Sequence, residues 1–504
     1  MKDKSPLPLR LFLQYFSGLP VLAAFFFGAA APAQANAIDW DWVPDGSGNW
    51  FDSNNWAPSD TETLLAWPND DAHTVFINRA LTGDATITID LSAIGDPSFV
   101  RTESLTIGDP NHTYTLAGGQ FRTANGITIA DNSTVIIESD WLQTGKTISG
   151  GAGSLLIMSG DINRDGGPGV TISGGLTMRF SGTMAFPSGA RHLAVGAGST
   201  LEIAKNGTIN TGGEINLSSH SSLGGTLTVH GGDRVITDGV STHLNTTIDL
   251  SPGNLTVGGV HFNGQTVVSS ARVTIRDGVF TSTGDVQYSM GTNASTNGFI
   301  ELDNATYILS GEGNTYTVNS GDGWVNDVTF RAVSGSSGTF VMNNADGSAT
   351  GSGNNLVIDE NITLRGNGFT QSTLVAMNGS TVRPGNSVGD LTVGDAVFDG
   401  GSTLFIDIIN DISSSLLVGD MTIEEGTTLT LSIVGSLLSP QTLVAYSGTL
   451  SGFFDTEDFA LPDGWTLDYG TGSNSTISVV PEPGLFALFS GLLALGLVFL
   501  RRRN

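Results

Sequence analysis

The chain contains no cysteine and few charged residues. The absence of cysteine excludes a disulfide framework, thiolate chemistry and zinc sites built from cysteine. Only 13% of the 504 residues are charged, about half the usual fraction, whereas glycine, with 68 residues, is about twice as frequent as usual. This composition excludes an ordinary helical enzyme and a charged disordered tail. Enough apolar material remains for a large core assembled from many short pieces.

Positive charge is especially scarce. Between residues 38 and 480, 14 Lys and Arg stand against 46 Asp and Glu, which gives a net charge of −32. A field of this sign repels nucleic acid and anionic lipid, and it favours solubility and cation binding. We therefore expect no nucleic-acid partner.

Helical periodicity is missing from the body of the chain. Short runs rich in β-branched residues alternate instead with Gly, Ser, Asn and Asp clusters, which is typical of strands and turns. A pattern [GN]-[ST]-T-[LV] recurs at irregular spacing, at residues 132–135, 198–201, 379–382, 401–404 and 426–429, and four of its five occurrences lead into such a run. The chain is predicted to be all-β, a right-handed parallel β-helix or solenoid. Serial β-sandwiches are the alternative, although their strands are usually longer.

The N-terminus has the pattern of a secretory signal peptide, residues 1–37. Three basic residues precede an apolar run at 19–31, and small-x-small cleavage sites end at Ala35 and Ala37. An uncleaved anchor helix is the competing interpretation. The pattern predicts that the protein is exported.

The C-terminus, residues 479–504, has three parts in a fixed order. A Pro-Glu-Pro motif is followed by an uncharged apolar run at 485–500, which is marginally long enough for a transmembrane helix. Three terminal arginines keep that end cytoplasmic and leave the motif outside. The motif is Pro481, Glu482 and Pro483, and the arginines are Arg501, Arg502 and Arg503.

These three parts resemble the PEP-CTERM sorting domain of Gram-negative bacteria, over about the last 25 residues. The resemblance implies that an exosortase recognises Pro481, Glu482 and Pro483 and cleaves near them. The protein would then reside only transiently in the inner membrane before it reaches the cell surface or the extracellular space, often alongside exopolysaccharide production. A plain C-terminal tail anchor is the alternative.

The region between the ends divides into three expected parts. Residues 38–84 are rich in tryptophan and are expected to cap the solenoid, although exposed indoles could instead stack on sugar rings. Residues 85–375 form the repeat region, and residues 376–478 a C-terminal β region. The segment 384–393 (PGNSVGDLTV) resembles autotransporter passenger repeats, which implies an autotransporter-like β-helix for the body.

One segment resembles part of a calcium loop. Asp161, Asn163 and Asp165 supply oxygen donors at positions 1, 3 and 5, and a glycine follows at position 6. Position 12 is Ile172, where a glutamate belongs, so a plain turn is the competing interpretation. No other cofactor is indicated, and no group of residues suggests a catalytic centre.

These features predict an exported, non-enzymatic surface or matrix protein, structural or adhesive and associated with exopolysaccharide. Two alternatives stay open. A polysaccharide-active β-helix enzyme would bring two or three carboxylates and Lys or Arg into one groove. A glycan-binding protein that uses its tryptophans would expose the indole rings.

Overall fold

The structure is a computed structural model that describes much of the chain between residues 37 and 482. Outside the described residues lie 1–36, 60–65, 94–98, 144–145, 165–169, 187–192, 205–206, 212–214, 218–225, 230–231, 237–239, 243–245, 259, 264–271, 290–297, 312–315, 319–326, 345–354, 459, 473–474 and 483–504. The predicted signal peptide, except Ala37, and the predicted membrane helix therefore lie outside the described residues.

Within the described residues the regular structure consists of strands in three sheets, with two short 3-10 helices, η1 (Ser53–Asn55) and η2 (Leu91–Ala93). The first sheet contains β1 (Ile38–Trp42), β3 (Trp56–Pro58), β4 (Asp70–Ile77), β6 (Val100–Ile107), β8 (Phe121–Ile129), β10 (Trp141–Gln143), β11 (Lys146–Gly150), β13 (Ile162–Arg164), β14 (Val170–Ser173), β16 (Thr183–Phe186), β17 (Leu193–Val195), β19 (Thr208–Thr211), β20 (Ile215–Leu217), β23 (Val240–Thr242), β25 (Val260–Asn263), β27 (Val286–Ser289) and β29 (Tyr316–Val318).

The second sheet contains β2 (Gly48–Asn49), β5 (Ala85–Ile89), β7 (Tyr114–Gly118), β9 (Thr134–Ile137), β12 (Leu155–Met158), β15 (Thr177–Phe180), β18 (Thr200–Ile203), β21 (Thr226–Val229), β22 (Gly232–Ile236), β24 (Thr246–Val257), β26 (Arg272–Ser282), β28 (Gly298–Gly311), β30 (Asp327–Ala332), β31 (Gly338–Asn344), β32 (Asn355–Ile358), β33 (Ile362–Gly366), β34 (Thr373–Ala376), β35 (Thr381–Pro384), β37 (Ala396–Phe398), β38 (Thr403–Ile409), β39 (Ile412–Ser413), β41 (Met421–Ile423), β42 (Thr428–Val434), β44 (Leu450–Ser451) and β45 (Thr456–Asp458). The terminal sheet contains β36 (Asp390–Thr392), β40 (Ser415–Val418), β43 (Gln441–Tyr446), β46 (Trp465–Asp468) and β47 (Ser475–Pro481).

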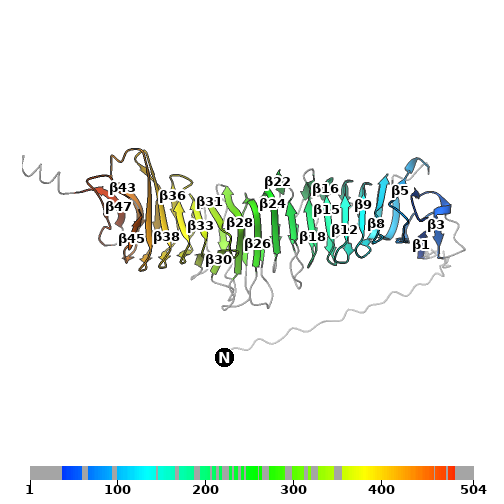
Figure 1. Ribbon diagram of the computed structural model, residues 1–504, viewed down its shortest axis with the longest axis horizontal. Helices are drawn as coiled ribbons and strands as arrows, with labels where there is room; N and C mark the ends of the chain where they lie inside the picture. Colours follow the sequence, from blue (N-terminus) through cyan, green and yellow to red (C-terminus); the bar gives the residue numbers. More distant parts are fainter. Residues whose placement is uncertain are drawn as a thin grey trace, which may run out of the picture. The chain divides into compact units, whose positions relative to one another are not determined.

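Most strands pair in parallel with the strand one coil later, and the coils follow one another in sequence order (Figure 1). In the second sheet β9 pairs with β12 and β12 with β15, which places Val135, Leu156 and Met178 in register. All three side chains are fully buried, and residues on either side of each alternate outward. Equivalent inward positions therefore stack from coil to coil into continuous apolar columns.

The recurring [GN]-[ST]-T-[LV] pattern forms a corner of the coil. Its first residue has a positive φ at every occurrence, a conformation that glycine and asparagine tolerate best. Its second residue is buried: the Ser402 amide donates to the Asp399 carbonyl at 3.0 Å, and the Ser402 hydroxyl donates to the same oxygen at 2.6 Å. The last residue, such as Leu404, enters the core. The sequence pattern thus marks a turn whose polar groups are satisfied locally.

The terminal sheet reverses the strand direction. β36, β40 and β43 are parallel, but β47 runs antiparallel to both β43 and β46. Gln441 pairs with Val479, and Trp465 pairs with Pro481. The beginning of β43 and the end of β47 therefore lie side by side, at the same end of the paired strands.

The expected all-β parallel solenoid is confirmed, and the serial-sandwich alternative is wrong. The parallel pairing of consecutive coils is the feature that distinguishes the two architectures. The right-handed winding stays a prediction.

Glycine at close contacts between coils gives a test of the stacking. Gly126 has φ +116°, and a Cβ there would lie 1.9 Å from the Thr147 carbonyl oxygen of the next coil. Gly198 has φ +68°, and a Cβ there would meet nothing within 4 Å. We expect Gly198→Ala to cost about 1–2 kcal/mol, a factor of about 5–30 in local opening, and Gly126→Ala to cost more.

Hydrogen exchange measures this opening at the amides of β8 and β11 for Gly126→Ala, and at the amides of β17 and β18, which flank residue 198, for Gly198→Ala. Equal protection in the two variants would contradict the close contact between the coils.

Candidate functional site

The predicted sorting motif begins inside the folded body. Pro481 is the last residue of β47, and the Glu482 amide donates to the Gly464 carbonyl at 2.8 Å. Both side chains are exposed. Pro483 lies outside the described residues, so the structure places two of the three motif residues at the C-terminal end of β47 in the terminal sheet.

The predicted membrane helix at 485–500 and the arginines Arg501, Arg502 and Arg503 lie outside the described residues. Among the described residues, no helix is long and apolar enough to span a bilayer. The assigned topology of the tail stays a prediction.

The predicted calcium residues are only partly described. The Asp161 carboxylate accepts a hydrogen bond from the Thr183 amide at 2.8 Å, so it ties one coil to the next. Asn163 lies within β13, where its backbone pairs with Leu142 and Ala185 on the neighbouring coils. Asp165 lies outside the described residues. Within the part of the chain that the structure covers, no group of three His, Asp or Glu is placed to hold a metal.

The tryptophans near the N-terminus are packed inside the first coils. Trp40, Trp42, Trp50 and Trp56 are all buried, and the rings of Trp42 and Trp50 contact Trp56 edge-on at centroid distances of 5.0 and 4.9 Å. The Trp50 Nε1 group donates to the Pro68 carbonyl at 3.0 Å. Buried indoles offer no platform for a sugar ring, so the cluster supports the interpretation as a cap.

A polar cavity of about 520 Å³ lies beside β28 and β30. Its lining includes Arg272, Glu301, Arg331, Asp359 and Glu360, which is the combination of side chains expected of a glycan-active groove. However, Glu301 is buried and accepts hydrogen bonds from Arg331 Nη2 at 2.6 Å and Nε at 3.0 Å. Arg272 lies 3.5 Å from its other oxygen. Glu301 therefore acts as the centre of an ion-pair network between coils.

Two further buried carboxylates are also held by structural contacts. The Asp407 carboxylate accepts from Arg383 Nε at 2.8 Å and Nη2 at 3.1 Å. Burial alone would raise the pKa of Asp109, but hydrogen bonds from the Asn111 and Leu81 amides hold that pKa below its ordinary value. These carboxylates serve as hydrogen-bond acceptors within the fold.

One carboxyl group has the opposite shift. Burial, followed by the charge of Glu424, raises the pKa of Asp399. The two residues directly follow the paired Phe398 and Ile423 on neighbouring coils. A raised pKa suits a general acid, but neither residue lines the two cavities described in this section. The shift is explained by the partial burial of Asp399 and, second, by the like charge of Glu424 at the equivalent position of the adjacent coil.

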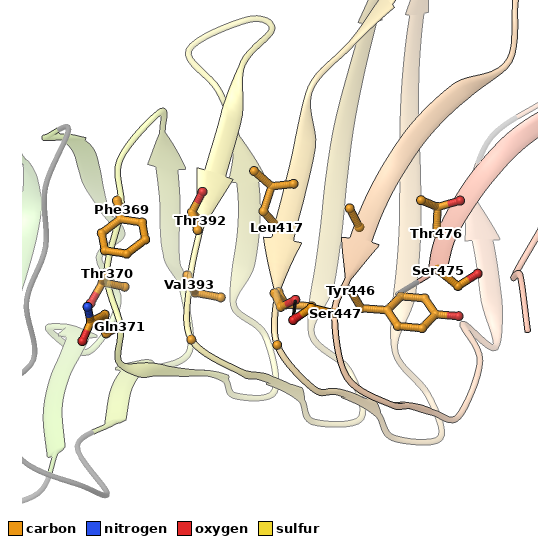
Figure 2. Close-up of a pocket in the computed structure, with 14 residues that line it drawn as sticks. Phe369, Thr370, Gln371, Thr392, Val393, Leu417, Tyr446, Ser447, Ser475 and Thr476 are labelled. Carbon is orange, nitrogen blue, oxygen red and sulfur yellow. Dashed lines mark hydrogen bonds between the residues drawn. The ribbon is translucent and has the colours of Figure 1, made fainter. Parts of the chain in front are cut away.

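An uncharged groove of about 560 Å³ crosses the terminal sheet (Figure 2). Phe369 pairs with Thr392, Thr392 with Leu417, Leu417 with Ala445, and Ala445 with Thr476. Because paired residues of neighbouring strands point to the same face, these five side chains form one row that runs across the strands. The row follows the direction in which the coils stack.

Apolar and hydroxyl-bearing side chains are mixed along this groove. Among the lining residues that the structure describes, none carries a charge, although the chain as a whole has a net charge of −28. The lining consists of Phe369, Thr370, Gln371, Thr392, Val393, Gly394, Leu417, Val418, Gly419, Ala445, Tyr446, Ser447, Ser475 and Thr476. An apolar floor with hydroxyl and amide groups suits a neutral, polyhydroxylated ligand.

This groove was not predicted, although the sequence carries a repeat that marks two of the coils that form it. Residues 391–398 (LTVGDAVF) and 416–423 (LLVGDMTI) repeat at the length of one coil. In each repeat an aspartate follows the glycine at a corner, and Asp395 accepts a hydrogen bond from the Asp420 amide at 2.8 Å. The repeat could have revealed which residues are stacked.

The buried histidine of the cap should make the N-terminal end sensitive to acid. His73 lies against Trp40 with a ring-centroid distance of 5.7 Å, and its Nδ1 accepts from the Asn69 amide at 3.2 Å. Burial lowers the pKa of His73 despite the opposing charge of Asp70. The unfolded state therefore binds more protons between the folded pKa and about 6.5, and the stability of the cap falls as pH falls through that window.

Tryptophan fluorescence during a pH titration reports this change, because most tryptophans lie in the cap. We expect His73→Phe to remove the pH dependence and His112→Gln to keep it, since His112 is more exposed. An unchanged titration in His73→Phe would assign the dependence to another group.

Comparison with known proteins gives no family assignment. No protein-family model matches the chain, and no curated protein matches it. The function proposed below therefore depends on the residues and geometry of this chain.

Proposed function

We propose that this chain is an exported, non-enzymatic surface or matrix protein, structural or adhesive in role and associated with exopolysaccharide. An exosortase would recognise Pro481, Glu482 and Pro483 while residues 485–500 hold the chain in the inner membrane. The solenoid would then be transferred to the cell surface or the extracellular space.

The observation that carries this proposal is the position of the motif. The last strand of the body, β47, ends at Pro481, so the folded solenoid and the motif meet without a spacer. Cleavage near the motif would release the body with its terminal sheet complete.

The non-enzymatic part of the proposal is supported by the carboxylates. Asp109, Glu301 and Asp407 are buried, and each accepts two or more hydrogen bonds from the surrounding fold. Groups held in this way stabilise neighbouring coils and are poorly placed to exchange protons with a substrate. Repeated weak contacts along an array of coils suit adhesion.

The sorting step is tested in a Gram-negative host that has an exosortase. Pro481→Ala combined with Pro483→Ala should leave the intact chain in the inner membrane, whereas the unaltered chain should appear outside with a C-terminus near Pro481. Mass spectrometry of the ends of the fractionated protein measures both. Pro462→Ala, at another exposed proline, is the control and should be sorted normally. Recovery of the unaltered chain from the inner membrane with Arg501–Asn504 still attached would contradict cleavage by an exosortase.

Glycan binding is a second candidate, and the groove of Figure 2 favours it. The row from Phe369 to Thr476 follows the stack of coils, so a linear neutral polysaccharide could contact several coils at once. Its apolar faces would lie on Phe369 and Leu417, and its hydroxyl groups would bond to threonine, serine and glutamine side chains.

Leu417→Asp introduces a charge into this uncharged groove and should abolish retention on a neutral polysaccharide such as cellulose or dextran. Val397→Asp is the matched control, because Val397 is a half-buried outward residue on another sheet, one coil before Leu417. Retention measured by co-sedimentation should survive in the control. Equal loss in both variants would point to general electrostatic repulsion and count against the groove.

A further inference from the structure

An apolar cluster lies at one edge of the C-terminal end of the solenoid. Its members are Ile412, Val434 and Leu438, which are 60%, 55% and 78% exposed. They are three of the five large hydrophobic side chains that are exposed among the described residues. A concentration of exposed apolar side chains at one place is typical of a surface that contacts a partner.

The backbone pairing shows that these residues are neighbours. Ile409 pairs with Ile412 on one side and with Val434 on the other. The side chains of Ile409, Ile412 and Val434 therefore share one face of the sheet. The Asp411 carboxylate, next to Ile412, accepts hydrogen bonds from the Leu438 amide at 2.8 Å and the Ser439 amide at 2.9 Å. We name Ile412, Val434 and Leu438 the apolar edge.

The apolar edge is held rigidly. The Asp411 carboxylate also accepts from the Ser439 hydroxyl at 2.8 Å and from Gln441 Nε2 at 3.0 Å, and the Ser413 hydroxyl donates to the Thr442 carbonyl at 2.8 Å. These bonds fix the loop before β43 against β39. The exposed side chains are therefore presented by an ordered surface.

The chain leaves the folded body at the same edge. Gln441 pairs with Val479 in an antiparallel ladder, so Pro481, two residues further on, leaves the sheet at the end of β43 that the loop with Leu438 and Ser439 precedes. Only Pro483 and Gly484 separate Glu482 from the apolar run at 485–500. Three residue steps span at most about 11 Å, which is little more than the depth of one headgroup layer.

We propose that the apolar edge rests on the lipid bilayer while residues 485–500 are embedded in it. This inference depends on the proposed function, because it requires the tail to be inserted. The short connection brings the end of β47 to the headgroup surface, and the apolar edge, which lies towards the same end of β43, enters the interface. The bilayer thereby orients the solenoid and covers hydrophobic side chains that become exposed after processing.

The absence of cysteine from the chain allows single-site labelling. Leu438→Cys, Phe453→Cys and Ser490→Cys in the full-length chain each carry an environment-sensitive fluorophore, and the protein is reconstituted into phosphatidylcholine vesicles that contain brominated lipid. Phe453 is the matched control, because it is 64% exposed and lies by the opposite end of β43, near Tyr446. Val434→Cys repeats the measurement at a second position of the edge.

We expect lipid-borne quenching and a blue shift for labels at Leu438, Val434 and Ser490, and neither change at Phe453. Quenching at Ser490 without quenching at Leu438 and Val434 would overturn the lipid contact and leave the inserted tail intact. No quenching at Ser490 would overturn both proposals.

Other occupants give different results. In detergent, protection of the Leu438 label from iodide that grows with protein concentration would assign the edge to a second copy of the chain. Protection that is independent of concentration, and is lost when residues 484–504 are removed, would assign the edge to the chain's own tail. Either result overturns the lipid contact.

Discussion

The backbone ladder between adjacent coils is the interaction on which the structure depends. A single coil cannot bury its apolar side chains, so each coil is stable only through the hydrogen bonds and the apolar columns that it shares with its neighbours. The two ends of such a stack have no further neighbour. The buried tryptophans cover one end, and antiparallel β47 and β46 extend past the last parallel strand of the terminal sheet at the other. The caps therefore follow from the same constraint as the coils.

Stacking also governs where charge can lie. Equivalent side chains of adjacent coils are about 4.8 Å apart, so like charges in register repel and opposite charges attract. Asp249, Arg276 and Asp303 occupy one such column, and the hydrogen bond from Arg276 to Asp303 raises the pKa of Arg276. Several arginines, among them Arg276, Arg331 and Arg383, are thus placed where they offset carboxylates on neighbouring coils.

The sequence predicted the coil and not the site. The [GN]-[ST]-T-[LV] pattern is local, and the positive φ at its first residue and the buried hydroxyl at its second follow from residue type. The groove at Phe369, Leu417 and Thr476 depends instead on register across several coils of unequal length, of which the repeat at 391–398 and 416–423 reveals only one pair. The tryptophan cluster could be read as a platform or as a cap until burial was known. The partial calcium pattern at Asp161 shows how easily the Asp, Asn and Gly of ordinary corners imitate a ligand loop.

Strand direction at the C-terminal end decides which surface lies beside the tail. If β47 had continued the parallel order, the chain would have left the sheet at the end of β43, near Phe453 and Tyr469. Because β47 is antiparallel, it leaves at the beginning of β43, beside the loop that Asp411 holds in place. One reversal therefore closes the stack of coils, positions Pro481 and Glu482 at an accessible edge and brings the apolar edge next to the exit of the chain. The capping of the solenoid and the presentation of its tail are consequences of the same two strands.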